Sequence, residues 1–324
     1  MAPSLVRRLV LAAALTLAAT SVFAAGGALS LVPADAVSVG VVRVADLRSS
    51  PLSSTLFQHA DRFGTNGEAA QFLTDAGLDL AKDIDVLVVA TSPLTRLGSE
   101  GEVLVLADGR FSVDRLSTAL VSRGAVRKAN YFTLPDSDRE SNKTGAVAFP
   151  SATLAIAGSE SAVIEALQAF KDGGTAFAQS ILGHEVGRVE AGASAWALVD
   201  VTRASRLTGG TDGLQHHGNK QHGQALSAAV RNISTVGMWA TDTGDSLKLG
   251  AFGLTSDAET LQLVEDTLRG ALSALRLSVK DRNPELVPVL RRFEVQRSDN
   301  AVEVTGSIPG DTLRDLMSHK RAKK

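Results

Sequence analysis

The sequence predicts an α+β fold: largely antiparallel sheets with helices packed on one face, in two tandem similar units. Short runs rich in valine, isoleucine and leucine recur along the chain, as buried strands require. Polar turn residues join several of these runs, which favours antiparallel hairpins. Stretches with apolar residues at helical spacing follow the hairpins, and such amphipathic helices need a sheet face to cover.

Two similar strands open the two units. Residues 36–44 (AVSVGVVRV) and 193–201 (ASAWALVDV) align without a gap. The predicted elements that follow come in the same order in both halves. We therefore expect a duplicated unit at 33–172 and 192–318, with a linker at 173–191. The alternative is that there is no duplication, because any α+β chain yields such a match by eye.

In the first unit, strands at 84–90 and 102–107 are predicted to pair across the loop 91–101. Ser112 can cap the next helix, which Gly124 ends. A second pair of strands and a closing helix complete the unit. These last elements are expected at 145–149, 152–157 and, behind Ser159, 160–170.

The second unit repeats this order with a clearer turn. Its strands 233–240 and 246–254 flank the polar turn 241–245 (TDTGD), which predicts a hairpin. Ser256 and Glu259 form a capping box for the following amphipathic helix. The last expected elements are the strands 293–296 and 301–308 and the closing helix 310–317.

The first 25 residues have the three parts of a secretory signal peptide. Two arginines supply the basic start, residues 9–23 are uncharged, and small residues follow. Val22 and Ala24 suit the −3 and −1 positions, so we expect cleavage after Ala24 or Ala25 and a periplasmic or secreted protein. The uncharged stretch continues to Val32, however, so an uncleaved membrane anchor is the alternative.

Composition narrows the classes of function. The chain has no cysteine, which excludes disulfides and a lipid-modified cysteine. Loss of Arg7 and Arg8 with the leader takes the formal net charge from −2 to −4, whereas nucleic-acid binding needs a basic surface. Two Trp and one Tyr leave few rings for stacking on sugars or bases. We therefore expect no nucleic-acid partner.

The candidate metal ligands lie in a glycine-rich segment at 207–223. His216, His217 and His222 are close in sequence there, and neutral imidazole binds Zn²⁺, Cu²⁺ and Ni²⁺. Their spacing matches no zinc-site pattern, so the alternative is a solvated surface loop without a metal. No other cofactor is expected, and the basic tail 319–324 is interpreted as a frayed terminus.

Two acidic segments and several absent motifs bear on catalysis. Residues 136–142 (DSDRESN) resemble the start of a calcium loop but lack its turn glycine and final glutamate. Asp79, Asp83 and Asp85 are expected to cap and solvate a turn. No P-loop, G-x-S-x-G elbow, G-x-G-x-x-G or H-E-x-x-H pattern occurs. The sequence therefore predicts no catalytic residue.

Two short motifs resemble a class of uncharacterised exported bacterial proteins. These proteins open their mature chain with L/V-P-A-D, as residues 31–36 (LVPADA) do here, and carry a glycine-aspartate phrase before a strand, as residues 76–85 do. The resemblance covers about half of the chain. It implies a place in the cell envelope and carries over no functional residue.

A sheet framework without a catalytic set predicts a non-catalytic envelope protein. We expect it to bind a protein partner or an apolar, lipid-like ligand through its sheet face or the cleft between the units. The alternatives are an envelope enzyme of hydrolase type, with a site built from residues distant in sequence, and a structural envelope component. Contact with the membrane is expected only if the N-terminal segment stays uncleaved.

Overall fold

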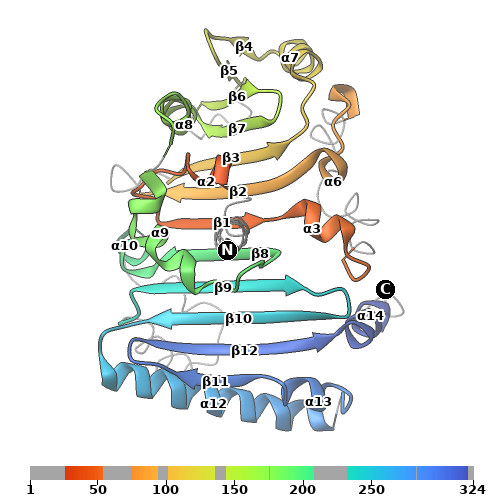
Figure 1. Ribbon diagram of the computed structural model, residues 1–324, viewed down its shortest axis with the longest axis vertical. Helices are drawn as coiled ribbons and strands as arrows, with labels where there is room; N and C mark the ends of the chain where they lie inside the picture. The colour runs from red at the N-terminus through yellow and green to blue at the C-terminus, as the bar shows by residue number, and fades with distance from the viewer. Residues whose placement is uncertain are drawn as a thin grey trace, which may run out of the picture.

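The strands form a single antiparallel sheet with helices on both of its faces (Figure 1). The computed structural model describes residues 26–53, 74–93, 101–135, 144–174, 176–207, 232–281 and 283–319. Within these ranges the sheet has twelve strands, in the order β11-β12-β10-β9-β8-β1-β2-β3-β7-β6-β5-β4. The α+β class and the antiparallel pairing are thus confirmed.

The strands match the predicted runs closely. Their bounds are β1 Ser38–Val42, β2 Ile84–Ser92, β3 Glu102–Gly109, β4 Val126–Arg127, β5 Phe132–Thr133, β6 Gly145–Ser151, β7 Leu154–Ser159, β8 Ala195–Asp200, β9 Thr235–Asp242, β10 Ser246–Leu254, β11 Glu294–Arg297 and β12 Ala301–Pro309. The helices are α2 Gly26–Leu29, α3 Val44–Ser49, α6 Leu80–Asp83, α7 Val113–Ser122, α8 Glu160–Lys171, α9 Ile181–Glu185, α10 Val201–Leu207, α12 Ala258–Lys280, α13 Leu286–Leu290 and α14 Gly310–His319, with 3-10 turns η2 Ala176–Gln179 and η3 Val186–Arg188.

The two look-alike strands meet at the middle of the sheet. β1 and β8 pair antiparallel, and Gly40 lies opposite Ala197. Outward from this pair the strand order is β1-β2-β3-β7-β6 on one side and β8-β9-β10-β12-β11 on the other. The two halves therefore share one continuous sheet and one strand order, while their origin by duplication stays a prediction.

One face of the sheet carries the main core. Alternate residues of the strands, including Val41, Val88 and Leu198, are buried there. Leu167 of α8 and Leu182 of α9 belong to the same apolar cluster, so these helices cover this side. We call it the core face.

The expectation that the helices lie on one face is wrong. Ala107 of β3 packs with Leu116 of α7, whereas its neighbour Leu106 packs in the main core with α8. Because successive strand residues point to opposite faces, α7 and α8 lie on opposite sides. α12 is on the side of α7, since its Leu261 packs with Val302 of β12. Both faces of these strands are apolar, and both therefore accept a helix.

The predicted cap of α12 is displaced by one residue. Asp257, and not Ser256, is the N-cap, and its carboxylate accepts hydrogen bonds from the backbone N–H groups of Glu259 and Thr260. Aspartate and serine are both good N-caps, and the charged side chain also suits the positive end of the long helix.

The apolar residues after the predicted cleavage site belong to the fold. Ala28, Leu31 and Val32 are buried in the main core. Among the described residues, no helix combines the length and the apolarity needed to span a bilayer.

Candidate functional site

An apolar trough runs across the middle of the sheet, on the face opposite the core face. We call it the central trough. Its volume is about 450 Å³. The residues that face it come from strands of both halves: Gly40, Val42, Leu87, Val89, Ala195, Ala197, Met238, Ala240 and Leu249.

Strand register brings small and large residues together in this trough. Gly40 lies opposite Val89 of β2 on one side and Ala197 of β8 on the other, and Ala197 lies opposite Met238 of β9. The glycine and the alanine leave the middle hollow. Val89 is 38% exposed and Met238 is 52% exposed, so the two large apolar side chains that flank the hollow are partly open to water.

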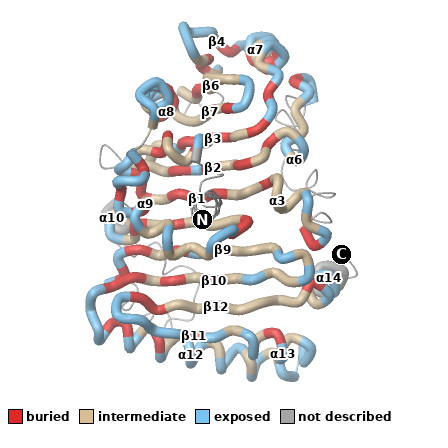
Figure 2. Tube along the Cα trace, viewed as in Figure 1, coloured by how far each residue is buried: buried red, intermediate tan, exposed pale blue. Residues whose placement is uncertain are grey.

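Helices border the central trough on its two sides. At one side Leu87 packs against the cluster that contains Leu116 of α7. At the other, Ala251 of β10 pairs with Val304 of β12, and Val304 packs against the α12 cluster. Figure 1 shows α7 and α12 near opposite ends of the sheet. Among the described residues, none that lines the trough belongs to a helix. Helix α3 lies beside it, since Val44 belongs to the cluster against which Val42 and Leu87 pack. Figure 2 shows buried and partly exposed positions alternating along β1 and β2.

The central trough has no chemistry beyond apolar contact. None of the residues that line it has a titratable side chain. The lining residues therefore supply no side-chain general acid or base. It can hold an apolar molecule, because removing apolar surface from water is favourable.

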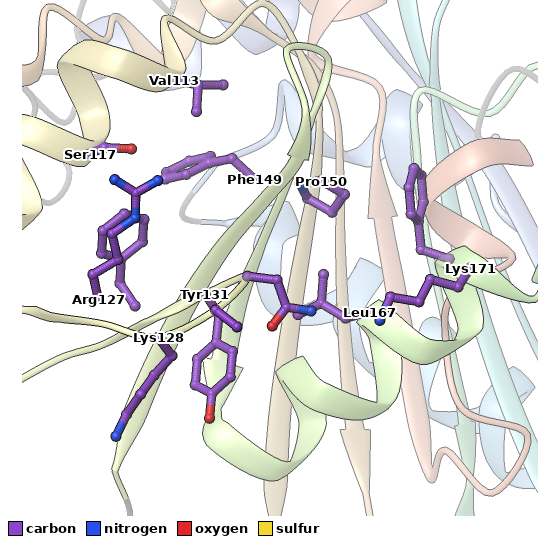
Figure 3. A pocket seen from close by; sticks show the side chains of 13 residues that line it. Val113, Ser117, Arg127, Lys128, Tyr131, Phe149, Pro150, Leu167 and Lys171 are labelled. Carbon is purple, nitrogen blue, oxygen red and sulfur yellow. The ribbon is translucent and has the colours of Figure 1, made fainter.

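A second hollow lies at the β4 end of the sheet (Figure 3). We call it the edge pocket; its volume is about 370 Å³. The Tyr131 hydroxyl, on its border, donates a 2.8 Å hydrogen bond to Glu160, and this bond raises the pKa of Tyr131. The pocket is lined by Val113, Ser117, Arg127, Lys128, Ala129, Asn130, Tyr131, Phe132, Phe149, Pro150, Leu167, Phe170 and Lys171.

The predicted metal ligands lie outside the described residues. This holds for His216, His217 and His222, and also for the calcium-loop-like residues 136–142. Within the part of the chain that the structure describes, no group of three or more His, Asp or Glu side chains is placed to hold a metal ion.

Of the acidic residues expected to cap and solvate this turn, Asp79 caps a helix, whereas Asp85 lies within β2 and forms an ion pair. Asp79 is the N-cap of α6 and accepts hydrogen bonds from the backbone N–H groups of Ala81 and Lys82. The hydrogen bond from the Lys82 side chain lowers the pKa of Asp79. Asp85 forms a 2.6 Å ion pair with Arg48.

One half-buried carboxyl group, that of Asp108, lies away from both hollows. Burial raises its pKa, and the nearby Asp85 charge adds to this. Its Oδ2 accepts a 3.3 Å hydrogen bond from the Ala28 N–H, which acts in the opposite direction. Asp108 therefore ties β3 to α2, just after the predicted cleavage site.

Sequence reasoning placed the trough residues in strands but did not identify the trough. The available signal was the placement of Gly40, Ala195 and Ala197 in the two look-alike strands. Small residues in adjacent strands leave a hollow wherever their register places them together, and this register was not predicted.

Comparisons with known proteins bear on the fold. No family model and no curated protein matches the chain. Similar solved structures include crystal forms of TP0453. Form III has a TM-score of 0.50 at 10% identity and covers 90% of this chain and 97% of that one; form IV has a TM-score of 0.48 at 9% identity, covering 90% and 96%. At this identity the likeness to form III shows the fold alone.

Proposed function

We propose that this protein is an exported, non-catalytic binding protein that holds an apolar, lipid-like ligand in the central trough. The observation that carries the proposal is the apolar floor of the trough, which no described helix covers, with Val89 and Met238 exposed on the two sides of its hollow. A protein that had no use for this surface would gain solubility from polar residues there.

The dimensions of the trough suit a small molecule with a hydrocarbon chain. Its volume of about 450 Å³ lies within the roughly 300–1,000 Å³ of typical ligand sites. Each methylene group that leaves water completely contributes about 0.8 kcal/mol. A chain laid along the floor keeps one side in water and gains part of this per methylene, which is enough for reversible binding.

Export is the second part of the proposal, and the position of the core supports it. The described core begins at Ala28, a few residues after the predicted cut at Ala24 or Ala25. Cleavage there leaves every described core residue in the mature chain. Since Leu31 and Val32 are buried in the fold, the apolar run to Val32 has an explanation other than an anchor. N-terminal sequencing of protein from an envelope fraction tests this; a chain that keeps Met1 contradicts it.

The shared strand order supports an origin of the two halves by duplication. In the β1–β8 register, Val39 pairs with Leu198 and Val41 with Trp196. The predicted alignment of residue 40 with residue 197 also aligns 39 with 196 and 41 with 198. Exchanging aligned residues therefore turns the first of these pairs into the second. A two-fold relation through the Gly40–Ala197 pair therefore places equivalent residues around the trough.

Binding of N-phenyl-1-naphthylamine tests the function. This uncharged dye fluoresces strongly only in apolar surroundings. We expect saturable binding that long-chain alcohols displace. Met238→Lys places a charge on the trough floor and should weaken binding at least about tenfold, since a buried unpaired charge costs more than 1.4 kcal/mol.

The matched control is Ile181→Lys. Ile181 of α9 is 50% exposed, about as much as Met238, and it lies on a helix that covers the core face. This variant should bind the dye as the unmodified protein does. Equal loss in both variants would contradict a site in the trough. Absence of dye binding in the unmodified protein would remove the apolar-ligand function and leave a protein partner as the occupant of this surface.

A further inference from the structure

The edge pocket is an apolar hollow formed where the regular sheet is interrupted. Phe149 and Pro150 of β6 lie at a register shift between β6 and β7. Such an irregularity turns side chains out of the regular ladder. Leu167 and Phe170 of α8 add further apolar lining, and Phe170 is 42% exposed.

Three basic side chains line the same hollow. Arg127 and Lys128 come from the β4–β5 hairpin and Lys171 from the end of α8. All three are exposed, and none forms an ion pair with a residue that the structure describes. The Arg127 guanidinium lies 5.8 Å from the ring centre of Phe132. In Figure 3, Arg127 and Lys171 stand on opposite sides of the hollow, while Lys128 points away from it.

The opposite end of the sheet provides a contrast. There, too, a hollow has arginines in its lining, between α12 and β11. Arg269 pairs with Glu265 at 2.8 Å, and Arg276 donates hydrogen bonds to the backbone carbonyls of Leu290 and Phe293 at 3.0 and 3.1 Å. These two arginines therefore have partners within the fold. The cations of the edge pocket have no ion-pair partner among the residues that the structure describes.

We propose that the edge pocket binds an amphiphilic anion: a small molecule with one anionic group on an aromatic or aliphatic body. The body lies against Phe149, Pro150 and Phe170, and the anionic group lies at the rim between Arg127 and Lys171. This site differs from the central trough in its ligand class, because the trough lining has no charge at all.

A pair of dyes separates the two sites. 8-Anilinonaphthalene-1-sulfonate has the aromatic body of N-phenyl-1-naphthylamine plus a sulfonate. We expect Arg127→Gln and Lys171→Gln each to weaken sulfonate-dye binding by up to about fivefold, as exposed ion pairs contribute up to about 1 kcal/mol, and to leave the uncharged dye unaffected. Raised salt should weaken binding of the sulfonate dye to the unmodified protein, and should weaken it much less in the double variant that carries both Arg127→Gln and Lys171→Gln.

Two controls keep the test decisive. Lys280→Gln removes an equal charge from the exposed end of α12 and should leave the binding of both dyes unchanged. Lys171→Arg keeps the charge and should retain sulfonate-dye affinity. The proposal is overturned if the double variant at low salt, with unchanged thermal unfolding, binds the sulfonate dye as the unmodified protein does. It is also overturned if Met238→Lys abolishes all binding of that dye. If the uncharged dye does not bind, that result contradicts only the ligand site proposed for the central trough.

Discussion

Neighbouring residues on the central strands have opposite environments. On β2, Val88 is fully buried under the helices of the core face, while the next residue, Val89, is 38% exposed in the trough. Both are valines, and the same alternation runs along β1 and along residues 197–200 of β8. The core face needs apolar residues for packing, whereas no described helix packs on the trough floor. Packing of the described helices therefore accounts for the apolar residues of the core face but not for those of the trough floor, which the proposed ligand would explain.

The largest expected effect is the difference in stability between a variant with a carboxylate on the core face and one with a carboxylate on the trough face. Val88→Asp buries an unpaired carboxylate in the main core and should destabilise the protein by about 4 kcal/mol or more. Val89→Asp leaves its charge in contact with water and should cost about 1 kcal/mol or less. Urea unfolding of both variants measures the difference. Similar losses would mean that the trough face is packed as tightly as the core face.

Two central glycines give a second, smaller contrast. A Cβ on Gly237 would lie 2.3 Å from the Phe252 ring on the core face, whereas a Cβ on Gly40 would have its nearest neighbour at 3.8 Å. Gly237→Ala should therefore destabilise the protein by about 1–3 kcal/mol. Gly40→Ala should be neutral or slightly stabilising, because it restricts the unfolded chain. Thermal unfolding checks both; a destabilising Gly40→Ala would show that the hollow is closed.

The smallest effect concerns Asp108, on the core face. Its pKa is raised in the folded state, mainly by burial, so the folded protein holds this proton more tightly than the unfolded chain. Stability should therefore fall as pH rises from the ordinary aspartate value of 3.8 through the raised one. Asp108→Asn should flatten this part of the profile. Urea unfolding between about pH 4 and pH 7 measures it, and Glu165, whose pKa is also raised, contributes equally to both proteins. An unchanged profile would contradict the assignment to Asp108.

Much of the fold was predictable because its longer elements have clear periods. The predicted strand 246–254 coincides with β10, and the helix expected at 160–170 is α8, Glu160–Lys171. The β4–β5 hairpin was missed because strands of two residues show no periodicity. The edge pocket was therefore not predicted either, because Arg127 of this hairpin lines it.

The central trough could not be predicted for a different reason. A strand that is apolar on both faces has the same composition whether one face or both are covered. Only the positions of α7, α8, α9 and α12 decide which face stays bare, and these arise from long-range packing. Small residues such as Gly40 and Ala197 indicate a hollow only once the β1–β8 register is known, because that register places them side by side.

Energy transfer from tryptophan to bound N-phenyl-1-naphthylamine tests the central claim most directly. The two tryptophans of the chain, Trp196 and Trp239, lie on β8 and β9, beneath the trough. Excitation of these residues should produce saturable dye emission, which Met238→Lys should shift to at least about tenfold higher dye concentration and Ile181→Lys should preserve. Equal emission from all three proteins, or none from the unmodified one, would contradict a ligand site in the central trough.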